Sequence, residues 1–236
     1  MSLRVANLTK RFGKKTAVNE LSFTVGDGEL VGFIGPNGAG KTTSLQCIAG
    51  FLRPDAGTIF VDGVAIERER GRVIALIAET PDVYPLLTIW EHLAFVARGA
   101  KLPSGWEERA SALLARFNLL EERNTLGQAA SKGMRQKTLI AATLLARTRV
   151  VLLDEPMIGL DPQGQRELRS IVRDLCAEGI AVVMSTHQID AAQEMCDRVV
   201  ILSRGSAVAQ GSFTELAASS DSGASLETIY FDLTAR

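Results

Sequence analysis

The sequence has few of the residues on which secreted, zinc-binding or membrane-spanning proteins depend. Its three cysteines, Cys47, Cys176 and Cys196, show no C-x-x-C spacing, so we expect small apolar packing residues in a reduced, cytosolic protein. No stretch approaches the roughly 18 consecutive apolar residues of a membrane span, and residues 1–15 have no signal-peptide core. We therefore expect that the chain cannot cross a bilayer by itself.

The sequence also lacks an excess of either charge. Its 26 basic residues balance 27 acidic ones, so no field of the whole chain attracts nucleic acid or anionic lipid. The 46% of apolar residues suffices for a sizeable core, in one large domain or in a core with an inserted subdomain. We find no internal repeat, and only residues 217–224 have the Ser, Ala and Gly content of a linker.

The clearest motif is a glycine-rich segment over residues 35–43 that fits the phosphate-binding template G-x-x-x-x-G-K-[ST]. The apolar run 30–34 has the length of a buried parallel strand, and 42–51 reads as a helix, which is the context that the motif requires. The glycines let successive N–H groups and the positive end of the helix face an anion. We expect nucleotide contacts from Gly35, Pro36, Asn37, Gly38, Ala39, Gly40, Lys41, Thr42 and Thr43.

Side chains in and before this segment suit a nucleotide and its metal ion. Lys41 would reach the β and γ phosphates, and the Thr42 hydroxyl would bind Mg²⁺. An ordinary glycine-rich turn is the alternative, and the flanking strand and helix make it the weaker one. Phe12, among cations and glycine, could stack on a purine base or pack into the β-rich lobe that residues 3–34 predict.

The middle of the chain reads as a helical insert. Thr88-Ile89-Trp90-Glu91 and Ser104-Gly105-Trp106-Glu107 both fit the capping box that begins a helix, and apolar residues at helical spacing follow each one. We therefore predict that residues 80–146 form a helical insert in an α/β core. Trp90 and His92 are interpreted as core and rim residues rather than ligands, because His92 has no spaced partner for a metal site.

Short apolar runs on both sides of the insert predict strands. They lie at 57–64, where Asp62-Gly63 marks a hairpin turn, and at 73–78, 150–153, 180–184, 199–202 and 207–209. A helix begins at Pro162, with Asp161 as its cap and Leu168, Ile171, Val172 and Leu175 on its core face. A terminal helical region begins at Thr214.

Two of these strands end in side chains that can do chemistry. Asp154, at the carboxyl end of a strand expected beside the phosphate-loop strand, can hold Mg²⁺, and Glu155 can polarise a water molecule. Acidic pairs also cap helices, but residues 157–160 are not helical in pattern, which favours the catalytic interpretation. His187 follows Ser185-Thr186 at another strand end, where a contact with the γ phosphate is plausible.

In this order, the motifs resemble the nucleotide-binding subunit of an ATP-binding cassette (ABC) transporter over about residues 3–215. The resemblance implies a P-loop NTPase core of α/β class, with a mostly parallel sheet, an antiparallel β lobe and an inserted α-helical subdomain. We place the core at 1–79 and 147–215, the helical subdomain at 80–146 and a tail at 216–236. By resemblance Phe12 stacks on adenine, Asp154 supports Mg²⁺, Glu155 positions the attacking water and His187 senses the γ phosphate.

Two departures from the family pattern stand out. The glutamine expected at a strand end is Glu79, which adds a negative charge near the triphosphate but can still bind Mg²⁺. The family's Leu-Ser-Gly-Gly-Gln signature appears as Ala130-Ser131-Lys132-Gly133-Met134, in which Ser131 and Gly133, expected to contact the γ phosphate, are retained. This variant resembles cassettes of bacterial ABC-2 exporters.

The resemblance implies an ATPase with ATP and Mg²⁺ as ligands, lying on the cytoplasmic face of the cell membrane. The signature of one subunit would face the phosphate loop of a second one, and hydrolysis would move an integral membrane subunit docked near residues 80–100. A soluble cassette that acts on DNA or ribosomes is the alternative; the segment between Lys41 and Asp154 lacks the long heptad insert of that class. A small-molecule kinase or a GTPase is weaker still, because the sequence has no Asn-Lys-x-Asp motif. The transported substrate, its direction and homodimer or heterodimer pairing stay open.

Overall fold

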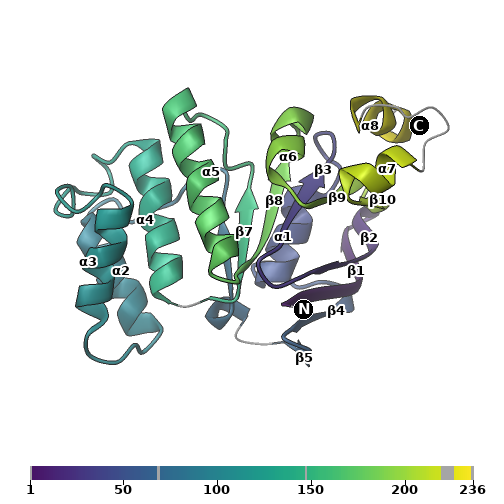
Figure 1. Ribbon diagram of the computed structural model, residues 1–236. Coiled ribbons are helices and arrows are strands. Elements are labelled where there is room, and N and C mark those ends of the chain that lie inside the picture. Colours follow the sequence, from purple (N-terminus) through teal and green to yellow (C-terminus); the bar gives the residue numbers. More distant parts are fainter. Residues whose placement is uncertain (1, 68–69, 147, 219–225, 235–236) are drawn as a thin grey trace.

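A central six-stranded sheet organises the molecule, for which a computed structural model describes residues 2–67, 70–146, 148–218 and 226–234 (Figure 1). Its order is β10-β9-β3-β8-β7-β6. The strands are β3 (Leu30–Ile34), β6 (Ile74–Ile77), β7 (Val150–Asp154), β8 (Ala181–Thr186), β9 (Arg198–Ser203) and β10 (Ser206–Gly211). All neighbours pair in parallel except the edge strand β10, which is antiparallel to β9.

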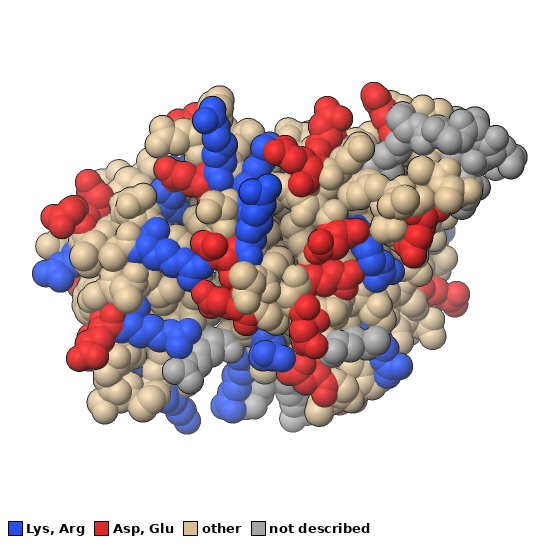
Figure 2. All heavy atoms as spheres, viewed as in Figure 1, with Lys and Arg blue, Asp and Glu red and all other residues tan. Residues whose placement is uncertain are grey.

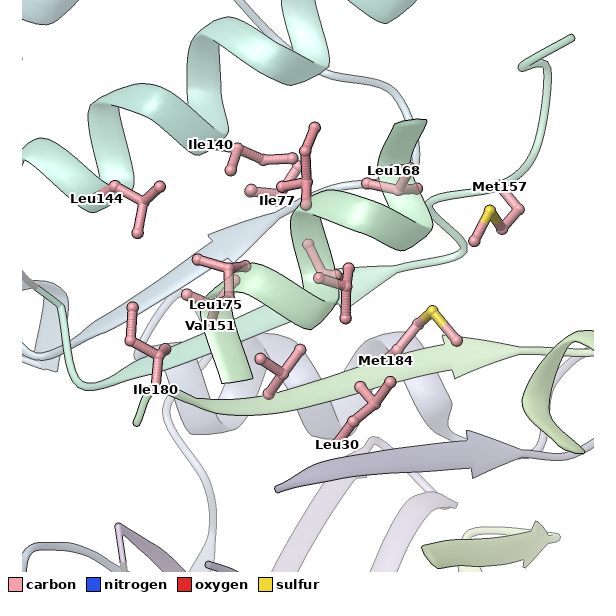
Figure 3. Close-up of a cluster of buried hydrophobic side chains, with 14 of the residues drawn as sticks. Leu30, Ile77, Ile140, Leu144, Val151, Met157, Leu168, Leu175, Ile180 and Met184 are labelled. Carbon is pink, nitrogen blue, oxygen red and sulfur yellow. The ribbon is translucent and has the colours of Figure 1, made fainter. Parts of the chain in front are cut away.

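The central strands are apolar throughout because both faces of the sheet are covered. Successive side chains alternate between the faces, so Val151 and Leu153 of β7 join one apolar cluster, and Val150 and Leu152 join the other. The first cluster lies under α4 (Lys132–Leu145) and α5 (Pro162–Ala177), as Figure 3 shows. The second packs against α1 (Lys41–Ala49).

A second sheet, of order β2-β1-β4-β5, forms an antiparallel lobe beside α1. It contains β1 (Leu3–Phe12), β2 (Lys15–Val25), β4 (Ala56–Val61) and β5 (Val64–Ala65). The predicted hairpin turn is confirmed: Asp62 (φ 50°) and Gly63 (φ 79°) both have the left-handed backbone that a two-residue hairpin loop requires. The predicted α/β class, with a mostly parallel sheet and an antiparallel lobe, is confirmed as well.

Three helices, α2 (Ile89–Gly99), α3 (Trp106–Arg116) and α4, occupy the stretch predicted as a helical insert. The capping box at Thr88 is confirmed, since Thr88 Oγ1 accepts from the Glu91 amide and the Glu91 carboxylate accepts from the Thr88 amide. The second predicted box, at Ser104, is wrong. Gly105 (φ 93°) is the N-cap of α3, so Glu107 falls on the second helical residue, one short of the box position. The subdomain boundaries themselves stay a prediction.

The two residues of α2 that sequence reasoning assigned to packing do pack. Trp90 lies 5.6 Å, centroid to centroid, from Trp106 of α3. His92 is buried and bonds through both ring nitrogens, with Nδ1 2.7 Å from the Thr88 carbonyl oxygen and Nε2 accepting from the Tyr84 amide at 2.9 Å. The interpretation of His92 as a structural residue is confirmed.

The remaining elements complete the sheet edges and the C-terminal region. They are the 3₁₀ turn Arg70–Arg72, α6 (Ile189–Met195), α7 (Phe213–Ala218) and α8 (Leu226–Thr234). Most of the predicted linker at 217–224 lies outside the described residues, although Ala217 and Ala218 end α7. No helix among the described residues is both long and apolar enough to span a membrane.

The cysteines and the surface charges behave as the composition predicts. Burial raises the pKa of Cys176 to about 11 and that of Cys196 to about 12, so both thiols stay protonated at neutral pH and act as packing residues. Figure 2 shows positive and negative side chains interspersed over one face of the molecule, without a large field of either sign.

Candidate functional site

Three segments that the sequence singles out meet at one edge of the six-stranded sheet. The phosphate loop follows β3, Asp154 and Glu155 lie at the end of β7, and His187 follows β8. Because these strands are parallel, their carboxyl ends share one edge. The expectation that the strand of Asp154 lies directly beside the phosphate-loop strand is wrong, since β8 separates β3 from β7. Strand order depends on how the crossovers wind around the sheet, which the residues of a single strand do not specify.

The phosphate loop needs glycine at its two template positions. A Cβ atom on Gly35 would lie 2.4 Å from the Leu202 carbonyl oxygen, and one on Gly40 would lie 2.4 Å from that of Ala17. Gly40 also has a left-handed φ of 103°, as has Gly38 with 82°. Gly40 is therefore required both by its backbone conformation and by its close neighbour, and Gly35 by the close approach of the Leu202 carbonyl.

Lys41, the first residue of α1, turns its side chain back into the loop. Its Nζ donates to the Gly35 carbonyl at 2.6 Å and lies 3.4 Å from Glu155 Oε1. Both side chains of this pair are largely buried, at 7% and 10% exposure, so the pair is weakly screened by solvent. An anion that enters the loop would compete with Glu155 for the Lys41 ammonium group.

Ser185, on β8, contacts both acidic residues at the end of β7. Its hydroxyl donates to Asp154 Oδ1 at 2.6 Å and accepts from the Glu155 amide at 2.9 Å. The Thr42 hydroxyl, on α1, donates to the same Asp154 oxygen at 3.2 Å, although β8 lies between β7 and the strand β3 that precedes the phosphate loop. Sequence reasoning placed Ser185 at a polar strand end and missed this bridging role. Ser185 lies opposite Asp154 in the parallel pairing of β7 and β8, and this pairing could have indicated the role only if the order of the strands had been known.

Glu155 occupies a strained backbone position between the side chains of Lys41 and His187. Its φ of 45° is left-handed, which is uncommon for a residue with a side chain and typical of functional sites. The carboxylate reaches Lys41 through Oε1 and His187 Nδ1 through Oε2, the latter at 3.0 Å. The structure thus brings together the three residues that sequence reasoning predicts as catalytic.

A pocket of about 340 Å³ opens over the phosphate loop. It is lined by Phe12, Lys15, Ala17, the segment 36–43, Glu79 and Glu155. Phe12 is half-exposed, which favours stacking on a flat ligand over packing into the β-rich lobe, and the Lys10 ammonium lies 5.4 Å from its ring centroid. Lys15 and Ala17 are additional wall residues that carry no recognisable sequence motif.

The oxygen donors at this pocket fit Mg²⁺. Thr42 Oγ1 and Asp154 Oδ1 lie 3.2 Å apart, and Glu79 lines the same pocket. Among the described residues there is no group of three or more His, Cys, Asp or Glu side chains that could hold a metal ion alone. Mg²⁺ typically uses one or two carboxylates and completes its shell with phosphate oxygens and water, so this sparse oxygen set suits it.

The signature residues lie elsewhere in the chain's own fold. Ser131 is the N-cap of α4 and accepts from the Met134 amide at 3.2 Å, and Gly133 is the second residue of that helix. Both line a separate cavity of about 480 Å³ between α4 and α5, with which the pocket over the phosphate loop shares no lining residue. The structure therefore does not bring Ser131 and Gly133 to the phosphate loop of the same chain.

Comparison with known proteins gives consistent matches. The family model described as ABC transporter matches residues 18–158. The lipopolysaccharide export system ATP-binding protein LptB of Haemophilus influenzae is 34% identical over 89% of this chain and 90% of its own length.

Solved structures match the fold as well as the sequence. A structure described as the ATP-binding subunit of an ABC transporter has a TM-score of 0.90 and 33% identity, covering 99% of both chains. A dimeric, post-hydrolysis ATP-binding cassette bound to ADP and Pi has a TM-score of 0.77 and 26% identity, covering 89% of this chain and 98% of its own.

Proposed function

Since this chain belongs to the ABC transporter family of ATP-binding proteins, we propose that the described edge of its six-stranded sheet binds and hydrolyses ATP. The family makes it an ATP-binding and ATP-hydrolysing subunit that powers a membrane transporter. One observation carries the residue assignments: the Glu155 carboxylate contacts both Lys41 and His187 at the mouth of the phosphate loop.

ATP binds along the pocket from Phe12 to Lys41. The adenine ring stacks on the half-exposed face of Phe12, and the loop N–H groups of residues 35–43 surround the phosphates. Lys41 exchanges its contact with Glu155 for the β and γ phosphates, while the Glu155 carboxylate keeps its described contact with His187. Binding thus changes the surroundings of Glu155 before any bond is broken.

We assign Mg²⁺ to this site, where Thr42, Asp154 and Glu79 would hold it. When bound, it would neutralise charge on the phosphate oxygens. Ser185 fixes the Asp154 carboxylate by donating to it, and thereby orients the oxygen that Thr42 also contacts. Glu79 supplies a carboxylate where the family pattern has an amide, which makes the site more negative.

Glu155 orients the attacking water and accepts its proton, and His187 holds the Glu155 carboxylate in place. Sequence-adjacent Asp154 and Glu155 act differently because Asp154 is tied to Thr42 and Ser185, whereas Glu155 faces the phosphate loop. His187 is exposed next to the site, where it can also contact the γ phosphate.

A second copy or a related cassette completes the site. Ser131 and Gly133 lie at the N-terminal end of α4, away from their own phosphate loop, so they contact the γ phosphate of ATP held by the other subunit. The dimeric cassette among the similar structures supports this arrangement. Two ATP molecules then hold two cassettes together, and hydrolysis releases them.

Apolar side chains around the start of α2 form the docking surface for an integral membrane subunit. Tyr84, Leu86, Phe95 and Leu126 are all exposed large apolar residues. The rings of Tyr84 and Phe95 are 5.3 Å apart, and Leu126 lies in the segment that pairs with Thr88. Contiguous exposed apolar side chains of this kind mark interaction sites. The cassette therefore sits peripherally on the cytoplasmic face of the membrane, and a role on DNA or ribosomes is not favoured.

The substitution Glu155→Gln tests the proposed chemistry. It retains ATP binding but removes the proton acceptor, so hydrolysis falls by about 100-fold or more. ATP-bound dimer then accumulates, which size-exclusion chromatography with ATP detects. Glu178→Gln, at an exposed glutamate paired with Arg116, is the matched control and hydrolyses ATP at the unaltered rate. Undiminished hydrolysis by Glu155→Gln would remove Glu155 from the mechanism.

A further inference from the structure

Two side chains of α4 hold the turn that follows Glu155. Lys132 Nζ donates to the Ile158 carbonyl, and Gln136 Nε2 donates to the Pro156 carbonyl at 3.0 Å. Gln136 is buried, and its Oε1 has no hydrogen-bond partner among the described residues, so the donor end alone fixes this amide. Helix α4 is thus held to the turn after Glu155 by two hydrogen-bond donors, Lys132 and Gln136, that lie four residues apart on the same helix face.

The Lys132 side chain also lies over Gly159, the last residue of this turn. A Cβ atom on Gly159 would be 3.1 Å from Lys132 Nζ and 3.4 Å from its Cδ, and the Gly159 φ is 73°. A side chain at position 159 would therefore crowd the lysine stem and strain the backbone of the turn. Lys132 is itself half-buried, which agrees with a side chain that lies along the protein surface.

The position of Lys132 is electrostatically unfavourable for a cation, which makes its carbonyl partner important. It is the first residue of α4, where the positive end of the helix repels cations, and the first turn of α4 has no acidic residue. Lys137, five residues later, is paired with the Glu167 carboxylate of α5. The described polar contact of Lys132 is with the Ile158 carbonyl oxygen, whose partial negative charge compensates for the repulsion from the positive end of the helix.

The same turn determines where Glu155 points. The Ile158 amide donates to the Glu155 carbonyl at 3.2 Å, so Ile158 is bonded to α4 through its carbonyl and to Glu155 through its amide. The strained φ of Glu155 persists only where the surrounding contacts hold it. Loss of the hydrogen bond to the Ile158 carbonyl would let the turn relax, and the Glu155 carboxylate would move away from Lys41 and His187.

We propose that Lys132 is a positioning residue for hydrolysis, which couples the N-terminal end of α4 to the orientation of Glu155 through the Ile158 carbonyl. The inference rests on the proposed role of Glu155. It also gives a role to Lys132, which stands where the family signature has a glycine. When ATP held by a second cassette contacts Ser131, the first turn of α4 is drawn toward the phosphate, and Lys132 transmits the displacement to Glu155 of its own chain.

The test compares ATP hydrolysis by full-length Lys132→Met, Lys132→Arg and Lys137→Met proteins. Methionine keeps the length of the stem but removes the donor, so kcat falls about tenfold, the size of one lost hydrogen bond from a charged group. KM for ATP stays within about twofold, because Lys132 does not line the nucleotide pocket. Lys132→Arg, which keeps a charged donor, restores most of kcat. Lys137→Met, on the same helix, keeps kcat.

The kinetic pattern separates positioning from other roles. An unchanged kcat in Lys132→Met would overturn the inference, as would an equal loss in Lys137→Met, which would indicate general weakening of the contact between α4 and α5. A raised KM with unaltered kcat would also overturn it, because Lys132 would then bind nucleotide directly. If circular dichroism shows that Lys132→Met does not fold, Lys132→Leu, which also lacks a donor, takes its place with the same expected loss. If the wild-type protein binds ATP but, like Glu155→Gln, does not hydrolyse it, the proposed function itself is contradicted.

Discussion

The two parts of the proposed ATP site are built in opposite ways. At the sheet edge, Lys41, Asp154 and Glu155 are buried and joined by hydrogen bonds and ion pairs within one chain. At the N-terminal end of α4, Ser131 is exposed, and its described hydrogen bond is the one that caps its own helix. The first part is complete in a single chain, whereas the second presents its groups outward. Substitutions in the two parts should therefore affect different steps.

Loss of the Lys41 charge is expected to have the largest effect. Lys41→Ala removes the cation that we expect the loop to direct at the phosphates and takes the Lys41 ion pair away from Glu155, so ATP affinity falls by roughly 100-fold or more. Isothermal titration calorimetry on the single cassette measures this loss. Lys101→Ala, at an exposed lysine of the helical stretch, serves as control and binds ATP normally. Unchanged affinity in Lys41→Ala would remove the phosphate loop from its central role.

Ser131→Ala should separate the second part from the first. The isolated cassette binds ATP with unaltered affinity, since Ser131 does not line the nucleotide pocket. Hydrolysis falls on the order of tenfold because the hydroxyl offered to the other subunit's γ phosphate is lost. The lost cap also lowers the free energy of unfolding by about 1 kcal/mol, which urea denaturation checks. Ser104→Ala, at the serine that does not cap α3, is neutral in both measurements. Weakened ATP binding by the single Ser131→Ala cassette would contradict the division of the site.

The smallest effect on ATP turnover is expected from Leu86→Asp. Leu86 is 75% exposed and lies outside both parts of the ATP site, so hydrolysis by the isolated cassette is unaltered. Recovery with the membrane fraction of cells should be lost, because a charge then lies in the apolar docking surface. Phe51→Asp, at a position with 74% exposure away from that surface, keeps membrane recovery. Equal membrane recovery of the Leu86 and Phe51 variants would place the docking surface elsewhere.

Local patterns in the sequence were sufficient for most elements and for the individual site motifs. The phosphate loop, the cap at Asp161 and the exposed Phe12 are where the sequence predicts them, because each depends on a few adjacent residues. The false capping box at Ser104 shows the limit of such patterns. A helix start also depends on the backbone of the preceding loop, and Gly105 accommodates a left-handed turn that moves the start by one residue.

A phosphate loop, a strand-end acidic pair and a strand-end histidine on an α/β core can all be predicted from the residues alone. How these features meet is visible in the folded chain: β8 lies between β3 and β7, Ser185 joins Asp154 to Glu155, and Lys132 holds the turn after Glu155. Motifs and amphipathic patterns depend on neighbours along the chain, but strand order and bonds between distant residues depend on the packing of the whole sheet.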